Sequence, residues 1–293
     1  MQIALPPVRL SGTAAELARR YLAGDLEPVE PRDAATVIVL RDGTGPGPEV
    51  YLLHRQTSMA FAAGMAVFPG GGVDPRDGEL PESAWSGPSA SAWAGRLGCT
   101  ETEARALVCA AVRETFEESG VLLAGPASAP GRVVGDVAGE DWERDRAALE
   151  SRELSLTDLL ARRGLALRTE LLGIWSAWTT PAFEPRRYRT WFFTARLPQG
   201  QVTRDVSTES SSVAWLAAGE AIAAAERGEL GLMPPTYLNC LELSGYADAA
   251  AVIAATRDRS VEMFTPEAEP VADGLVLSLL PHHAALLETH RRG

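Results

Sequence analysis

The apolar positions in the first part of the chain predict two strands of a sheet. Residues 35–40 form an almost uninterrupted apolar run rich in β-branched residues, which is typical of a strand buried on both faces. Residues 50–55 predict a second strand, and the glycines and prolines of residues 43–48 predict the turn between them. Further strands are predicted over residues 121–123, 171–180, 187–197, 213–216 and 274–280.

Helical periodicity is clearest between residues 100 and 120. Thr100 and Glu103 have the spacing of a capping box, and Gly120 is suited to end the helix. Between them an apolar stripe recurs at helical spacing, formed by Ala104, Val108, Ala111, Val112 and Thr115. Shorter helices are predicted over residues 13–23, 89–97, 141–163, 218–227 and 234–257.

Three glutamates of the central helix share one face. Glu114, Glu117 and Glu118 are spaced i, i+3 and i+4, so a helix stacks their carboxylates on one side. Like charges on one patch repel, whereas a hard divalent cation that prefers oxygen ligands, such as Mg²⁺, reverses that penalty. Arg113 precedes Glu117 by four residues and can steer its carboxylate with a charge-assisted hydrogen bond. The pattern indicates a metal site, and the alternative is a solvated helix face with ion pairs along it.

This segment resembles the second half of the Nudix box, the signature of the Nudix hydrolases. The family pattern is glycine, five residues, glutamate, seven residues, and then Arg-Glu-apolar-any-Glu-Glu-any-Gly-apolar. The residues that match are Gly71, Arg113, Glu114, Glu117, Glu118, Gly120 and Val121, with Thr115 in the apolar place. Gly71 and Arg113 are 42 positions apart where the pattern has fourteen, which we assign to an insertion over residues 72–99. The first glutamate is missing: Asp77 stands at its distance from Gly71, and Arg105 at its distance from Arg113.

The resemblance extends over roughly residues 34–280 and is strongest to a subgroup of Nudix enzymes, the mammalian peroxisomal coenzyme A diphosphatases, which also have a long insertion in the box. The matching stretches are residues 52–55, 67–71, 175–181, 186–188, 192–193, 215, 232–236 and 273–276. The resemblance implies an α/β fold, the Nudix α/β/α sandwich, with a mixed β-sheet and helical insertions. The expected division is a helical extension over 1–30, a Nudix domain over 31–230 with insertions at 72–99 and 125–165, and a mostly helical C-terminal extension over 231–293, packed on the Nudix domain.

The resemblance also implies a reaction. It is the hydrolysis of a diphosphate linkage in a nucleoside diphosphate derivative, first of all coenzyme A or an acyl-CoA, with Mg²⁺ or Mn²⁺. The expected metal ligands are Glu114, Glu117 and Glu118, and the expected catalytic residues are Glu114, Glu117, Arg113 and Glu209. The expected substrate-binding residues are Arg55, Arg186, Arg187, Gly70 and Gly71. Glu209 equally fits a solvated loop, and the arginines at 186 and 187 equally fit an exposed strand end.

Two other functions are compatible with the same box. One is a pyrophosphatase acting on ADP-ribose, NADH or a nucleotide sugar, because all these enzymes share the box. A second arginine that other Nudix coenzyme A enzymes carry before the conserved glycine is missing, since Ala60 and Phe61 occupy that neighbourhood. The other is a non-catalytic Nudix-like sensor that binds a nucleotide, against which the intact set of three glutamates argues.

The amino-acid composition limits the classes of partner that the protein is expected to bind. The 293-residue chain has a net charge of −12, which argues against general nucleic-acid binding. All 27 basic residues are arginine, so any basic contact to a phosphate must use a guanidinium group. No apolar run approaches the roughly 20 residues of a membrane span, and no signal peptide is evident. We therefore expect a cytoplasmic enzyme for a small nucleotide substrate, with a homodimer as a possible assembly.

The insertion over residues 72–99 is expected to flank the site. Both of its ends are anchored beside the metal-binding helix, and it carries Trp85 and Trp93 in an otherwise small, flexible composition. We predict a lid or wall whose exposed tryptophans contact the non-phosphate portion of the substrate. The alternative is that the two side chains pack against the domain.

Overall fold

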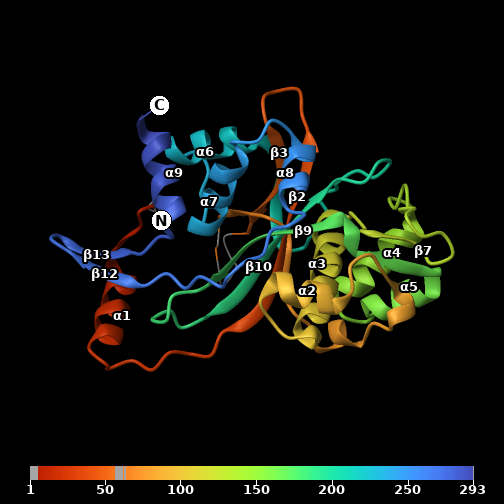
Figure 1. Ribbon diagram of the computed structural model, residues 1–293, viewed down its shortest axis with the longest axis horizontal. Coiled ribbons are helices and arrows are strands. Elements are labelled where there is room, and N and C mark those ends of the chain that lie inside the picture. Colours follow the sequence, from red (N-terminus) through yellow and green to blue (C-terminus); the bar gives the residue numbers. More distant parts are fainter. Residues whose placement is uncertain (1–5, 57–61, 63, 293) are drawn as a thin grey trace.

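A mixed sheet forms the centre of the molecule (Figure 1). The computed structural model describes residues 6–56, 62 and 64–292. Within these, the sheet has the strand order β11-β3-β2-β10-β9, with the short strand β4 paired to β3 and β5 paired to β2. The strands are β2 (Arg32–Asp42), β3 (Pro48–Arg55), β4 (Ala66–Val67), β5 (Gly70–Gly72), β9 (Leu172–Thr179), β10 (Tyr188–Arg196) and β11 (Ser210–Ala217). Only β2 and β10 run parallel, and the other pairs of this sheet are antiparallel.

Alternation along the central strands explains the two helical layers. In β2, Val37 and Val39 enter one buried cluster, while Ile38 and Leu40 enter another on the opposite face. The first face is covered by α3 (Glu101–Ser119) and the second by α6 (Ala218–Glu226), α7 (Pro234–Leu243) and α8 (Ala249–Ala255). Figure 1 shows the sheet between these groups of helices. The predicted α/β/α sandwich with a mixed sheet is therefore confirmed.

The segment over residues 121–123 does not form the predicted strand. The amide nitrogen of Leu122 donates to the side-chain oxygen of Gln201 at 2.9 Å, and the side-chain nitrogen of Gln201 donates to the Leu122 carbonyl at 2.9 Å. One side-chain amide thus satisfies both polar groups of this buried backbone in place of a neighbouring strand. A strand begins directly after this segment, at Ala124, as β7 (Ala124–Pro126). It belongs to a separate small sheet with β6 (Trp85–Ser86) and β8 (Leu165–Arg168).

The insertion after Gly71 packs onto α3 and the hydrophobic core beneath it. It contains the short 3-10 helices η1 (Pro75–Glu79) and η2 (Glu82–Ala84) and, as predicted, the helix α2 (Ala90–Leu97). Trp93 is fully buried and meets Phe193 of the main sheet edge-to-face, with ring centroids 5.8 Å apart. Trp85 is also buried and donates its indole N–H to the Pro88 carbonyl at 2.7 Å. The expectation of two exposed tryptophans on a lid is wrong, because both rings complete the hydrophobic core.

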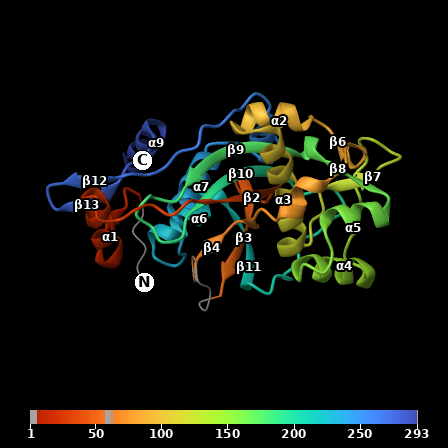
Figure 2. The same ribbon diagram turned by 90° about the horizontal axis from the view of Figure 1, so that it is seen from below.

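The predicted helices over residues 141–163 are two, α4 (Glu140–Glu150) and α5 (Leu156–Arg163). They lie with β7 and β8 at one end of the molecule, as Figure 2 shows. At the other end, α1 (Gly12–Leu22) packs beside a sheet that pairs β1 (Arg9–Leu10) with the hairpin β12 (Ala268–Val271) and β13 (Gly274–Leu277). The two ends of the chain are therefore joined by strand pairing. The last helix, α9 (Pro281–Arg292), packs against α7, and no helix of the described residues could span a membrane.

Candidate functional site

Helix α3 carries the three glutamates, and its ends follow from the sequence. Thr100 and Glu103 form the predicted capping box, since each side chain accepts from the other residue's backbone N–H. Gly120 ends the helix in the left-handed conformation with φ 71°, which favours glycine. The helix is buried along most of its length against the sheet, so the positions of its last-turn carboxylates are fixed by packing.

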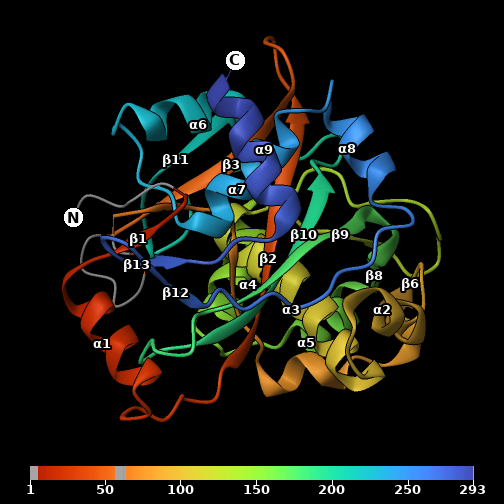
Figure 3. The ribbon, with the colours of Figure 1, turned by 60° about the vertical axis from the view of Figure 1, so that its left-hand side comes forward.

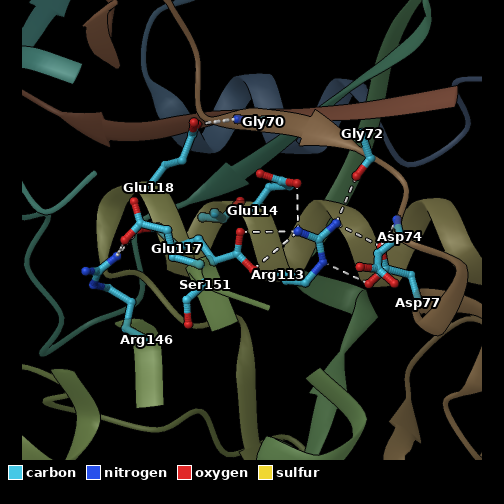
Figure 4. A network of polar contacts seen from close by, with 12 residues as sticks. Gly70, Gly72, Asp74, Asp77, Arg113, Glu114, Glu117, Glu118, Arg146 and Ser151 are labelled. Carbon is cyan, nitrogen blue, oxygen red and sulfur yellow. Dashed lines mark hydrogen bonds and ion pairs between the residues drawn. The ribbon is translucent and has the colours of Figure 1, made fainter. Parts of the chain in front are cut away.

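Arg113 is the centre of the polar network at this end of the helix (Figure 4). Its Nη1 donates to Glu114 at 2.7 Å and to both carboxylate oxygens of Glu117, at 3.2 and 3.3 Å. Its Nη2 donates to the Gly72 carbonyl at 2.9 Å. The arginine therefore orients Glu117, as the sequence predicts, and orients Glu114 as well.

The remaining face of Arg113 is occupied by Asp77. Nε and Nη2 donate to the two carboxylate oxygens of Asp77, each at 2.9 Å, in a two-pronged ion pair. Asp77 also accepts from the backbone N–H of Asp74 at 2.8 Å and so helps to form η1. Arg105, the other candidate for the missing glutamate position, instead contacts the Leu80 carbonyl and Glu82. Asp77 therefore stands in the structure where the first glutamate of the box is expected, next to Arg113. The residues that this chain has in addition to the Nudix box then lie between Asp77 and Arg113.

The glycines of β5 bring backbone against the carboxylates. The Gly70 N–H donates to Glu118 at 2.7 Å. A Cβ placed on Gly71 would lie 2.6 Å from the carboxylate of Glu114, closer than real Cβ contacts, so only glycine leaves room for that side chain. Gly70 is equally confined, because a Cβ there would lie 2.5 Å from the Ala35 carbonyl. The predicted close approach of the glycine loop to the helix is thus seen in the geometry.

Burial and mutual repulsion favour the neutral forms of the three glutamates when no cation is bound. Burial, together with the charge of Glu114, raises the pKa of Glu117 to about 7. Burial is also the main cause that raises the pKa of Glu114 and of Glu118. Arg113 contacts Glu114 and Glu117, whereas Glu118 accepts from the Gly70 N–H, so the positive charge beside the three carboxylates does not balance theirs.

This donor set fits a hard divalent cation. All three groups offer carboxylate oxygens, which Mg²⁺ and Mn²⁺ prefer, and a cation would reverse the repulsion that raises their pKa values. The residues that would hold it are Glu114, Glu117 and Glu118. When bound, such an ion neutralises phosphate charge and activates water.

Glu209 and Arg55 lie at the edge of the same site. They form an ion pair at 2.8 Å across the pairing of β11 with β3. Together with Glu118 they line a small hollow, whose other residues are Leu53, Val67, Ser207 and Ser210. The charge of Arg55 lowers the pKa of Glu118, and that of Glu209 raises it, which shows that both charges act on this carboxylate. The structure thus brings together two residues that the resemblance assigns to the site, at its solvent side.

Arg186 and Arg187 lie farther along the sheet. Arg187 donates through Nε to the Thr180 carbonyl at 3.1 Å and through Nη1 to the Val29 carbonyl at 2.8 Å. Its own carbonyl accepts from the N–H of Arg32, four residues along β2 from Thr36, which pairs with Gly70. At the rise of an extended strand this is about 13 Å along β2 from the position of Gly70, and about 7 Å from that of Gly72, which pairs with Ala34. Ala60 and Phe61, which the sequence places near the missing arginine, lie outside the described residues.

A second network of hydrogen bonds and ion pairs joins α4 to the backbone of α3, and it was not predicted from the sequence. Arg146 donates to the backbone carbonyl of Glu117 at 2.7 Å and to Glu150 at 2.9 Å (Figure 4). Glu150 accepts from both the N–H and the hydroxyl of Thr208, at 2.8 and 2.7 Å, next to Glu209. The network therefore connects α3 with the loop that carries Glu209. The contacts that join α4 to the rest of the network span 29 and 58 positions, so no local sequence pattern could reveal them.

Known proteins of similar sequence and structure identify the family of this chain. A sequence model of the NUDT19 Nudix domain matches residues 95–243, half of the chain. The acyl-coenzyme A diphosphatase NUDT19 of Gallus gallus is 27% identical over 297 residues, which cover 85% of this chain and 78% of the relative. The Homo sapiens protein of the same name is 28% identical and covers 83% of this chain and 73% of its own. The crystal structure of a NUDIX hydrolase from Alicyclobacillus acidocaldarius aligns with a TM-score of 0.65 at 27% identity, covering 77% of this chain and 96% of that chain. This chain belongs to the NUDT19 Nudix domain family and is a Nudix diphosphate hydrolase.

Proposed function

We propose that the enzyme hydrolyses the diphosphate linkage of coenzyme A or an acyl-CoA, releasing adenosine 3′,5′-bisphosphate and a phosphopantetheine product. The observation that carries the proposal is the carboxylate cluster of Glu114, Glu117 and Glu118, held between Arg113 and the glycine loop. The substrate class rests on two relatives named acyl-coenzyme A diphosphatase, each aligned with more than four-fifths of this chain.

In this proposal the three glutamates hold a divalent cation, Mg²⁺ or Mn²⁺. Arg113 keeps Glu114 and Glu117 in place through their shared Nη1 contacts, and Asp77 in turn holds the guanidinium plane. A glutamate at the cluster or at its rim receives the proton of the attacking water. Glu114 and Glu209 are the candidates, because Glu114 belongs to the cluster and Glu209 lines the hollow beside Glu118.

Substrate contacts follow from where positive charge is available. Arg55 lies beside Glu118 and, within the described part of the chain, forms its ion pair with the half-exposed Glu209, so a phosphate oxygen can compete for its guanidinium. We also assign Gly70 and Gly71 to contact with the diphosphate, because the backbone of this loop lies directly against the Glu114 carboxylate. We assign Arg186 and Arg187 to an anionic group of the substrate apart from the diphosphate, since Arg187 is bonded to Arg32 at the N-terminal end of β2, about 13 Å along the strand from the position of Gly70. The 3′-phosphate of coenzyme A is such a group.

The alternative substrates are ADP-ribose, NADH and nucleotide sugars, which contain the same linkage. A substrate panel distinguishes them: the protein is incubated with coenzyme A, acetyl-CoA, ADP-ribose, NADH and UDP-glucose, with Mg²⁺ or with Mn²⁺, and the products are separated by ion-exchange chromatography. We expect the highest kcat/KM for coenzyme A or acetyl-CoA. A higher kcat/KM for ADP-ribose, NADH or UDP-glucose would refute the proposed substrate class and retain the reaction.

A further inference from the structure

A second group of metal-ligating side chains lies on the opposite side of the sheet from the glutamate cluster. Glu242 is in α7, and His282 and His283 begin α9. We propose that Glu242, His282 and His283 bind a transition-metal ion, with Zn²⁺ as the best match. The three side chains each offer a ligand atom, and these atoms lie within 4.8 Å of one another. Figure 3 shows α9 lying along α7, in the layer that also contains α6 and α8.

The distances in the cluster suit a coordination sphere. Nε2 of His282 is 3.0 Å, and Nε2 of His283 is 3.1 Å, from the same oxygen of Glu242. Ligand atoms bound at about 2.0–2.1 Å from one zinc ion are separated by about 3 Å, so an ion can enter with small shifts of these groups. Two imidazoles and one carboxylate form a set that zinc and its neighbours in the first transition series accept, whereas Mg²⁺ prefers oxygen alone.

Neighbouring residues hold two of the ligands in place. Arg259 donates to the second oxygen of Glu242 at 3.1 Å, which leaves the first oxygen for the histidines. The ring of His283 is buried and stacks on Trp178, with ring centroids 5.3 Å apart and planes 15° apart. His282 is 57% exposed on its side chain, which leaves solvent access for a fourth ligand.

One feature of the cluster limits its affinity. The buried Nδ1 of His283 has no hydrogen-bond partner among the described residues. Metal-bound histidines normally donate their other N–H to an acceptor, and loss of that contact weakens binding by roughly 10–100-fold. We therefore expect weaker binding than at fully supported zinc sites. A bound ion would tie α9 to α7 and stabilise the C-terminal part of the fold, away from the catalytic face.

The test is calorimetric titration of the metal-free protein with Zn²⁺ in excess Mg²⁺, which fills the all-oxygen site but competes poorly for imidazole. One Zn²⁺ per chain is expected to bind, and His282→Ala and Glu242→Gln are expected to weaken it at least about 10-fold. His290→Ala is the matched control, because His290 is on the same helix but pairs with Glu226. Zn²⁺ should also raise the melting temperature of the wild type and not that of His282→Ala.

Co²⁺ gives an independent readout, because nitrogen ligands at a site of low coordination number produce strong visible absorption, whereas octahedral all-oxygen sites absorb weakly. The bands are expected in the wild type and His290→Ala and absent in His282→Ala. If Glu242→Gln does not fold, His282→Ala decides the question, since its side chain is largely exposed. Absence of Zn²⁺ binding in the wild type, or an unchanged Kd in His282→Ala, would overturn the proposal and leave a purely hydrogen-bonded cluster.

Discussion

Asp77→Asn tests whether the buried ion pair behind the glutamates holds them in place. The substitution keeps the shape of Asp77 but removes its charge and one of its two acceptor oxygens. The side chains of Asp77 and Arg113 are only 2% and 10% exposed, so solvent cannot replace the lost contact. Arg113 would then keep Glu114, Glu117 and the Gly72 carbonyl, with one neutral acceptor oxygen left at position 77. The guanidinium is therefore expected to shift toward the carboxylates that the reaction requires.

The magnitude follows from the contacts. Removing one partner of a buried ion pair costs about 3–5 kcal/mol when the other charge is left alone. Arg113 keeps two other carboxylates, at 2.7 and 3.2 Å, so we expect a smaller loss of about 2 kcal/mol in the free energy of unfolding, close to one charge-assisted hydrogen bond. Displacement of the catalytic carboxylates should lower kcat by about 10-fold, equivalent to about 1.4 kcal/mol in the activation free energy.

The assays are urea unfolding and steady-state kinetics at saturating Mg²⁺. Asp74→Asn is the matched control, because Asp74 is in the same turn but pairs with the more exposed Arg76, and surface pairs contribute about 1 kcal/mol or less. The control should keep nearly the wild-type kcat. If Asp77→Asn retained both the stability and the kcat of the wild type, Asp77 would have no part in positioning Arg113, and the reasoning would fail.

Three further outcomes are expected. Because the pKa of Glu117 is raised to about 7, the folded metal-free protein binds more protons than the unfolded chain, so its stability should fall as the pH rises from about 4.5 to 7. A melting temperature in EDTA that rises over this pH range, or a stabilisation by Mg²⁺ that is no larger at pH 8 than at pH 5.5, would contradict this. Gly71→Ala should lower kcat about 10-fold, since its Cβ would lie 2.6 Å from a carboxylate, whereas Gly72→Ala, with no foreign atom nearer than 4.0 Å, should not. Arg146→Ala should lower the free energy of unfolding by about 2 kcal/mol and should also lower kcat, because the buried Arg146 bonds the Glu117 carbonyl. The control is Arg144→Ala, on the exposed face of the same helix; if it had equal effects, Arg146 would have no role in positioning Glu117.

Local patterns predicted the helix of the site correctly. The capping box at Thr100, the terminating Gly120 and the spacing of the three glutamates depend on neighbours within one or two turns, which the sequence displays directly. The central strands were equally visible, because β2 is apolar on both faces and is in fact buried on both.

Contacts between residues far apart in the sequence explain the features that local patterns did not predict. Trp93 was expected on an exposed lid because its sequence neighbours are small, yet its partner Phe193 is a hundred positions away in the main sheet. Residues 121–123 are as apolar as a strand, but the distant Gln201 satisfies the backbone of Leu122. The choice between Asp77 and Arg105 likewise depended on which side chain meets Arg113, and spacing along the chain cannot decide that.

The central claim is that the glutamate cluster of α3 holds the cation for diphosphate hydrolysis of coenzyme A. The most direct measurement is the formation of adenosine 3′,5′-bisphosphate from coenzyme A by the wild type and by Glu117→Gln, at saturating Mg²⁺ and with folding verified by circular dichroism. We expect product from the wild type and a loss of at least about 100-fold in kcat in the variant, equivalent to about 2.7 kcal/mol. Wild-type turnover in the folded variant, or no cleavage of coenzyme A by the wild type, would contradict the claim.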